Sequence, residues 1–329
     1  MPSEFGLYTG HDLLKEEEPG ESPLIQNILY QGDVAFFVAE EKSGKSIFGL
    51  QLACALTSGE PLFGMFEVPE PHMVLYVQAE GRRSETSRRL QVMVKTLQFN
   101  PELFRLLWTP GLELDTITGR NQFIQQVSTI KPAPKLIIID PLYTSVRGNL
   151  SDGEVTSGTI RTFRMILDAF QTSLFVFHHA HRMKRDLKGF EIDEGDDILY
   201  GSKFWKACAD HIFLGKMDKK AKRLVVTCDT QRTANIVDKM DLILREPDPL
   251  HFESIEATPH PATGESRQGV EDYLRKHEAG CPIHEIQQAL ILSRRTVFYC
   301  LGSLLREGKV SKDRPNGRGP AIYSLKQSG

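Results

Sequence analysis

The sequence lacks the features that mark secreted, membrane-spanning and disulfide-stapled proteins. No apolar run approaches the roughly 20 residues that a helix needs to cross a bilayer. The first residues, MPSEFGLYTGHDLLKEEE, have neither the basic nor the apolar region of a signal peptide. Only five of the 329 residues are cysteine, and no two form a CxxC pair. We therefore expect a cytoplasmic protein with free thiols and no membrane partner.

Net charge is nearly absent as well, with 40 Lys and Arg against 43 Asp and Glu. Taken alone, this balance argues weakly against a nucleic-acid-binding protein. The charge is unevenly distributed, however, because residues 1–21 hold six acids and one base, whereas residues 267–329 hold 11 bases and 6 acids. Such asymmetry often marks a basic binding module at one end of the chain.

Hydrophobic residues (40%) and charged residues (25%) are present in ordinary globular proportions, which excludes disorder and collagen-like repeats. Apolar strand patterns alternate with helical patterns up to residue 179, which predicts an α/β fold with a mainly parallel central sheet. We expect an acidic arm at 1–21, a large α/β domain at 22–257, a Pro/Gly/Ser/Thr-rich linker at 258–266 and a small domain at 267–329.

The large domain is expected to alternate five strands with four helices. The predicted strands are Val34–Val38, Met73–Gln78, Phe104–Trp108, Lys135–Asp140 and Leu174–His179. The predicted helices are Lys45–Ser58, Arg83–Leu97, Gly119–Ile130 and Thr159–Ala169. A charged, non-periodic segment at 180–200 follows, and four short strands beyond it are expected to extend the sheet edge in antiparallel fashion.

The strongest motif is AEEKSGKS, residues 39–46, which lies directly between a predicted strand and a predicted helix. Backbone N–H groups of such a loop wrap phosphate oxygens, and the helix presents its positive end to them. Lys45 is expected to reach the β- and γ-phosphates of ATP, and Ser46 to ligate Mg²⁺. The expected nucleotide-binding residues are Lys42, Ser43, Gly44, Lys45, Ser46 and Ile47.

Two features of this motif are unusual. Ala39 occupies the place of the first glycine in the pattern GxxxxGK[ST], which is acceptable as long as its φ angle is negative. Glu40 and Glu41 lie beside the expected anion, so we expect both side chains to point away from it.

Three further polar residues end neighbouring strands. Asp140 follows four apolar residues and is expected to orient Mg²⁺. Glu80 is either the general base that polarises the attacking water or an acid that stabilises a helix N-terminus. Of His178 and His179, strand alternation brings only one to the nucleotide, and we prefer His179.

Four segments carry a family resemblance: AEEKSGKSIFGLQLACALTSGEPLFG, VLYVQAEG, LIIIDPL and FVFHHAHR. In their order and spacing they resemble the RecA-fold ATPases of the RepA type, hexameric plasmid replication helicases related to the DnaB class. The resemblance covers residues 22–245 and implies a RecA-like P-loop NTPase core that uses ATP and Mg²⁺. It implies that Glu80 is the catalytic glutamate and that His179 senses the γ-phosphate. Its relatives also include recombinase-like and regulatory ATPases.

The resemblance implies a homo-oligomer, with a hexamer favoured, whose sites are completed by an arginine of a neighbouring subunit. Arg232 is the candidate for this catalytic role, although a surface salt bridge explains it equally well. Arg88 and Arg89 are further candidates for nucleotide or interface contacts. The segment 180–200 takes the place of a central DNA-binding loop, but its acids leave a plain solvated loop equally open. Its candidate contacts are Arg182, Lys184 and Arg185.

The small domain is predicted to contain three helices and a β-ribbon, an arrangement that resembles a winged helix-turn-helix. The helices are expected at Arg267–His277, Ile283–Leu290 and from Ser293 to about Arg306. Candidate DNA contacts on the third helix and the wing are Arg294, Arg295, Lys312, Arg314 and Arg318. Because many winged helices bind proteins or only pack, nucleic-acid contact stays one of two interpretations.

The leading hypothesis is an ATP-dependent DNA motor, a RepA-like replicative helicase with single-stranded DNA at its core and duplex DNA at the winged helix. The alternative is an ATP-switched DNA-binding regulator or recombinase-like mediator without processive unwinding. A metabolic P-loop kinase would explain the phosphate loop but would leave the small domain without a role.

Overall fold

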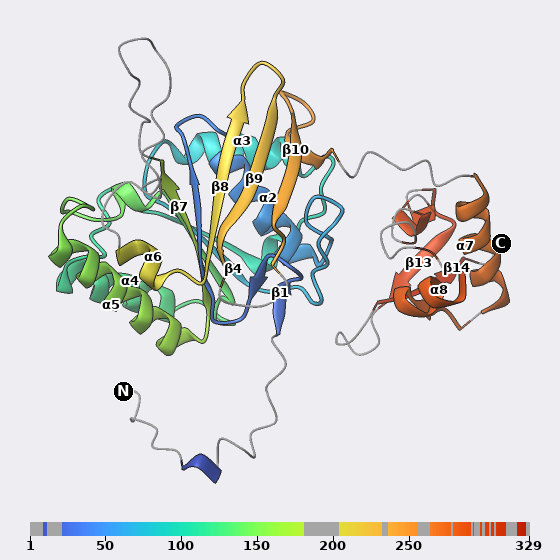
Figure 1. Cartoon of the computed structure of the whole chain (residues 1–329), viewed down its shortest axis with the longest axis horizontal. Coiled ribbons are helices and arrows are strands. Elements are labelled where there is room, and N and C mark those ends of the chain that lie inside the picture. The colour runs from blue at the N-terminus through green and yellow to red at the C-terminus, as the bar shows by residue number, and fades with distance from the viewer. Residues whose placement is uncertain are drawn as a thin grey trace. The chain divides into compact units, whose positions relative to one another are not determined.

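In the computed structural model, the described residues are 9–11, 22–180, 204–231, 236–255, 264–277, 279–290, 292, 297, 300–302, 304–305, 307–313 and 321–326. The chain divides into two compact units (Figure 1), one built mainly from residues before Ser254 and the other mainly from residues after it. No helix in these ranges has the length and apolarity needed to cross a membrane. All five cysteines are free thiols.

The first unit is organised around a nine-stranded sheet with the order β11-β10-β9-β8-β3-β7-β6-β4-β5. The strands are β3 (Val34–Ala39), β4 (Val74–Gln78), β5 (Phe104–Trp108), β6 (Leu136–Asp140), β7 (Ser173–His179), β8 (His211–Asp218), β9 (Arg223–Gln231), β10 (Lys239–Arg245) and β11 (His251–Ser254). The strands from β5 through β8 in this order run parallel. The predicted α/β class with a mainly parallel sheet is therefore confirmed.

Helices cover both faces of this sheet, which is why β3, β4 and β6 are buried along their whole length. One face packs through Phe36 and Val176 onto α4 (Ile117–Ser128), α5 (Gly153–Phe170) and α6 (Phe204–Cys208). The opposite face places the rings of Phe37 and Phe175 against Phe48 of α2 (Lys45–Ser58). Helix α3 (Arg83–Met93) contacts α2, and Figure 1 shows this layered arrangement.

The strand that follows the charged segment differs from the prediction. β8 runs parallel to β3, and only β9 and β10 continue in antiparallel fashion. The chain between β7 and β8 spans residues 180–210, which is long enough to return to the opposite edge of the sheet before the next strand begins.

Two helices also differ in extent. α3 ends at Met93 rather than Leu97, because Met93 is fully buried whereas Val94 is 41% exposed. α5 begins at Gly153 rather than Thr159, where the side chain of Asp152 caps it by accepting a hydrogen bond from the Glu154 N–H at 2.8 Å. A two-stranded sheet of β1 (Pro23–Ile25) and β2 (Leu29–Tyr30) was not predicted.

The second unit has its own core. Its elements are α7 (Gly264–Lys276), β12 (Cys281–Pro282), α8 (Ile283–Leu290), β13 (Val310–Asp313) and β14 (Ile322–Leu325), with the sheet order β12-β14-β13. The third predicted helix lies partly outside the described residues, but Val297, Cys300, Leu301 and Leu304 from that segment are buried in the core. The three-stranded sheet gains β12, which was not predicted.

The side chain of Gln51 fastens α2 to β11. Its Nε2 donates a hydrogen bond to the Phe252 carbonyl at 2.9 Å, and its Oε1 accepts one from the Phe252 N–H at 2.7 Å. Both bonds are buried, so one side chain satisfies both backbone groups of a residue 201 positions away.

We expect Gln51→Ala to lower the free energy of unfolding by about 2–4 kcal/mol, because two buried backbone groups would lose their partners. Chemical denaturation measures this value. The matched control is Gln125→Ala on exposed α4, which should change stability by less than about 0.5 kcal/mol. Equal effects of the two substitutions would contradict a specific role for the Gln51 bonds.

Candidate functional site

The phosphate loop is shaped by one glycine and one tight turn. Gly44 caps α2 with a φ of 86°, and a Cβ atom there would lie 2.7 Å from the Phe252 ring. The Ser43 hydroxyl donates a hydrogen bond to the Glu40 carbonyl at 2.7 Å. No side chain of the described residues caps the first turn of α2, so its N–H groups are available to an anion.

Lys45 is buried where β3 meets α2. Its Nζ donates hydrogen bonds to the carbonyls of Ala39, at 2.9 Å, and Glu40, at 2.6 Å. Burial lowers the pKa of Lys45 to about 8, while Asp140 and Glu80 oppose this shift. The ammonium group is thus held at the carboxyl edge of the sheet among groups that favour its charge.

Asp140 ends β6 and is joined to the phosphate loop through a tyrosine. The Tyr76 hydroxyl donates a hydrogen bond to Asp140 Oδ2 at 2.5 Å and also interacts with the Ser46 hydroxyl. Burial first, and then the Asp140 carboxylate, raise the pKa of Tyr76, so its hydroxyl stays protonated. The two expected Mg²⁺ ligands therefore share one buried hydroxyl.

Glu80 lies in the turn after β4, whose last residue pairs with Asp140 across the sheet. Gln78 holds this turn, because its Nε2 donates to the Glu80 carbonyl at 2.8 Å and its Oε1 accepts from the Thr86 hydroxyl at 2.9 Å. Burial, and then Asp140, raise the pKa of the Glu80 carboxyl. A carboxylate with a raised pKa is a better proton acceptor for water.

The two histidines at the end of β7 face opposite sides of the sheet. His178 is fully buried against Phe36 and Trp205. His179 places its Nδ1 3.4 Å from Lys45 Nζ. Burial and the nearby lysine lower the pKa of His179, so a neutral ring accepts from the ammonium group and keeps its other nitrogen for a donor role.

These groups line one cavity of about 900 Å³. Its predicted members are Lys42, Gly44, Lys45, Ser46, Ile47, Glu80, Asp140 and His179. Ser43 instead turns its hydroxyl into the loop. Glu41 also lines the cavity, so the expectation that it points away is wrong; its charge acts on the pKa of Lys45.

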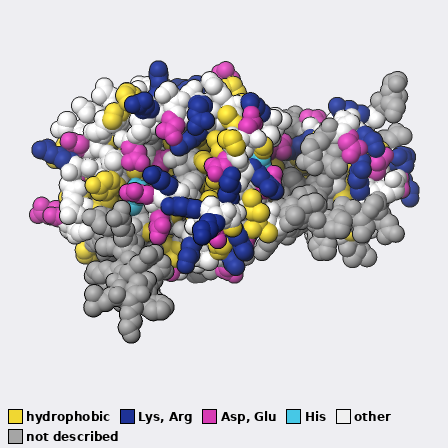
Figure 2. Space-filling model, turned by 90° about the horizontal axis from the view of Figure 1, so that it is seen from above, with side chains coloured by type: hydrophobic (Ala, Val, Ile, Leu, Met, Phe, Trp, Pro, Cys, Tyr) yellow, Lys and Arg dark blue, Asp and Glu magenta, His cyan; other side chains and the backbone are white. Residues whose placement is uncertain are grey.

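The opposite wall comes from residues that sequence reasoning missed. They are Tyr143, Met217, Lys219, Lys222, Leu244 and Glu246, and Arg89 joins them. The basic run DKKAKR at 218–223 was the available signal for the two lysines. Figure 2 looks onto one end of the molecule and shows Lys and Arg side chains interspersed with acids.

Several candidate residues lie outside the described part of the chain. They are Arg182, Lys184, Arg185, Arg232, Arg294, Arg295, Arg314 and Arg318. Lys312 lies on β13 of the second unit.

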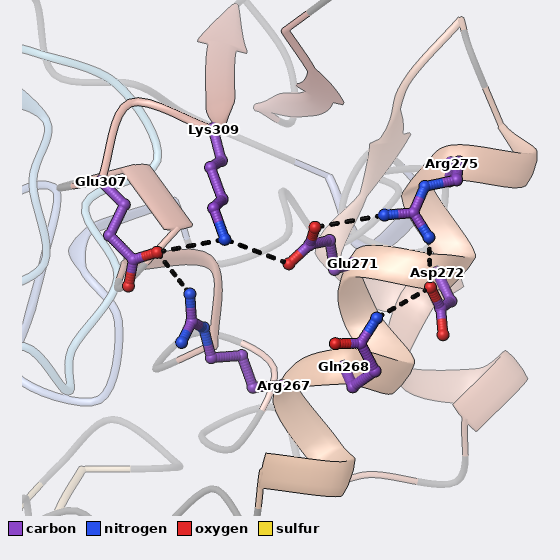
Figure 3. Close-up of polar contacts among 7 residues, drawn as sticks. All are labelled: Arg267, Gln268, Glu271, Asp272, Arg275, Glu307 and Lys309. Carbon is purple, nitrogen blue, oxygen red and sulfur yellow. Dashed lines mark hydrogen bonds and ion pairs between the residues drawn. The ribbon is translucent and has the colours of Figure 1, made fainter. Parts of the chain in front are cut away.

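Ion pairs occupy several cations of the second unit (Figure 3). Arg275 of α7 contacts Asp272 at 2.5 Å and Glu271 at 3.2 Å, and Lys309 lies 3.8 Å from Glu271. Glu307 binds both Arg267 and Lys309. Part of the positive charge counted in this unit is therefore already balanced by acids.

A phosphate loop between a buried parallel strand and a helix, facing acids from two adjacent strands, defines a P-loop ATPase core. The sequence profile of a family described as an AAA domain matches residues 3–184, more than half of the chain. The protein belongs to this family, and its members' ATPase chemistry accounts for the nucleotide-binding loop.

Two solved structures are similar to this chain. One, the ATPase domain of another protein, has a TM-score of 0.49 and 12% identity, and the match covers 65% of this chain and 82% of that one. The other, the RadB recombinase, has a TM-score of 0.48 and 18% identity, with coverages of 68% and 91%. No curated protein matches the sequence.

We expect ATP affinity to fall as the pH rises through about 8, because the unliganded protein then loses the Lys45 charge and must regain a proton to bind a triphosphate. The Kd of a fluorescent ATP analogue should rise about tenfold or more between roughly pH 7 and pH 9.5. Lys45→Arg keeps its charge throughout this range. Equal pH dependence in both proteins would contradict the assignment.

Proposed function

We propose that the protein is an ATP-dependent DNA-binding motor of the cytoplasm, a RepA-like replicative helicase that hydrolyses ATP at the interfaces of a homo-oligomer, with a hexamer favoured. The observation that carries this proposal is the convergence of Lys45, Glu80, Asp140 and His179 on one cavity. This set supplies a phosphate-binding cation, a proton acceptor, a metal-orienting acid and a neutral hydrogen-bonding ring.

The residues at the site fit Mg²⁺. Ser46 and Asp140 offer hydroxyl and carboxylate oxygens, the donors that this cation prefers, and both interact with the same Tyr76 hydroxyl. Bound there, Mg²⁺ would neutralise phosphate charge.

The chain's own residues then share the work of hydrolysis. Lys45 binds the β- and γ-phosphates and stabilises charge that develops during transfer. Glu80 orients a water and takes its proton, and His179 contacts the γ-phosphate beside Lys45.

The DNA-binding part of the proposal rests on charge and on positions in the chain. Arg182, Lys184 and Arg185 would meet single-stranded DNA at the core. Arg232 would complete a neighbouring subunit's site. At a winged helix-turn-helix in the second unit, Arg294, Arg295, Lys312, Arg314 and Arg318 would contact duplex DNA.

The first test separates binding from hydrolysis. Lys45→Ala should abolish both nucleotide binding and ATPase activity, because the buried phosphate-binding cation is lost. Glu80→Gln should still bind nucleotide while ATP turnover falls by about 10²- to 10⁴-fold. Steady-state phosphate release and fluorescent nucleotide titration measure the two effects. DNA-stimulated ATPase activity in Lys45→Ala would refute the site.

A second candidate function is an ATP-switched regulator or recombinase-like mediator that binds DNA without processive unwinding. The ion pairs of Arg267, Arg275 and Lys309 favour it, because they reduce the free positive charge of the second unit.

A forked-duplex assay distinguishes the two functions. A motor should separate the strands with ATP and not with Glu80→Gln, and light scattering should show an oligomer when ATP and single-stranded DNA are present. ATP turnover that is slow and indifferent to DNA would favour the switch. A strict monomer under all conditions would exclude an arginine supplied by a neighbouring subunit.

A further inference from the structure

We propose that Tyr76 is a positioning residue of the nucleotide site, one that holds Ser46 and Asp140 ready for the divalent cation that accompanies ATP. This inference rests on the proposed function, since it assumes that the cavity binds a metal–nucleotide complex. It adds a residue from the middle of a strand to the groups at the strand ends.

The position of Tyr76 is fixed by packing. The side chain is 1% exposed and lies in β4 beneath α2. A Cβ atom on Gly49 of α2 would lie 3.2 Å from the Tyr76 ring and 2.6 Å from the ring of Phe177. The helix backbone therefore rests directly on these two rings, and the tyrosine has no room to change rotamer.

The hydroxyl group of Tyr76 links the two expected cation ligands in one direction. A hydroxyl has a single proton, and Tyr76 donates it to Asp140 Oδ2 at 2.5 Å. In its interaction with Ser46, the Tyr76 oxygen must therefore accept, so the Ser46 hydroxyl donates. The hydrogen bonds run from Ser46 through Tyr76 to Asp140.

This direction has a consequence for metal binding. Because the Ser46 proton is directed toward Tyr76, the lone pairs of Ser46 Oγ are left for a cation. Asp140 commits one carboxylate oxygen to Tyr76 and keeps the other. Phenylalanine at position 76 would fill the same space, since Phe37, Phe175 and Phe177 already form this layer, but it would release Ser46 and leave Asp140 Oδ2 without its donor.

The test is Tyr76→Phe, with Mn²⁺ as the probe. Electron paramagnetic resonance titration of the ADP-bound protein should give a Mn²⁺ affinity about tenfold weaker than that of the wild type, the effect expected for loss of a group that orients metal ligands. Affinity for fluorescent ADP in the presence of EDTA should stay within about twofold. Tyr273→Phe, in the second unit, is the matched control and should change neither value.

A double-mutant cycle tests whether Tyr76 acts through Asp140. In an Asp140→Asn background, Tyr76→Phe should have at most a small further effect on Mn²⁺ affinity. Unchanged Mn²⁺ affinity in the single variant would overturn the proposal, and so would an equal loss of ADP affinity in EDTA, which indicates a purely structural role. If the wild type binds no nucleotide at all, the proposed function itself fails.

A second measurement does not depend on the variant folding. In wild-type protein labelled with fluorotyrosine, the ¹⁹F resonance of Tyr76, identified by replacing the other tyrosines in turn, should shift when Mg²⁺ is added to the ADP complex. A Tyr76 resonance that stays in place, while Mg²⁺ strengthens ADP binding, would overturn the proposal.

Discussion

A buried lysine ammonium is the constraint on which the rest of the site depends. Taking the charge of Lys45 out of water is costly, and it persists only with close polar partners. The carbonyls of Ala39 and Glu40 supply two of them, which requires the chain to turn back over its own strand before α2 begins. The left-handed conformation of Gly44 makes that turn possible, and the carboxylates of Asp140 and Glu80 favour the charge from neighbouring strands.

Sheet order explains why those strands are neighbours. β7 lies between β3 and β6, and its register sets His179 beside Ala39. β4 follows β6 and sets Gln78 beside Asp140. Parallel pairing places every strand's carboxyl end on one edge, so segments distant in sequence deliver their polar groups to one cavity. The same edge is tied to the last strand of the first unit, because Phe252 packs against Gly44 and its backbone binds Gln51.

The sequence predicted most of the sheet and the residues that line the cavity, because apolar runs that end in polar residues are a local signal. It predicted the helix Lys45–Ser58 with the observed bounds. It did not predict that β8 is parallel or that Lys219 and Lys222 reach the cavity, since both depend on how a long connection returns to the sheet. Tyr76 also escaped notice, because a tyrosine within an apolar strand looks like core until its hydroxyl is seen to meet two partners.

The charge of the second unit has to be located before it can be interpreted. The excess of basic residues in 267–329 falls within residues 292–320, which hold seven Lys and Arg and two Asp and Glu. Residues 267–291 hold three bases and four acids, and α7 spends Arg267 and Arg275 on ion pairs. A phosphate backbone is attracted by cations that acids do not already neutralise. Helix α7 therefore offers little to a nucleic acid, and any such contact belongs to the segment from the end of α8 to the start of β14.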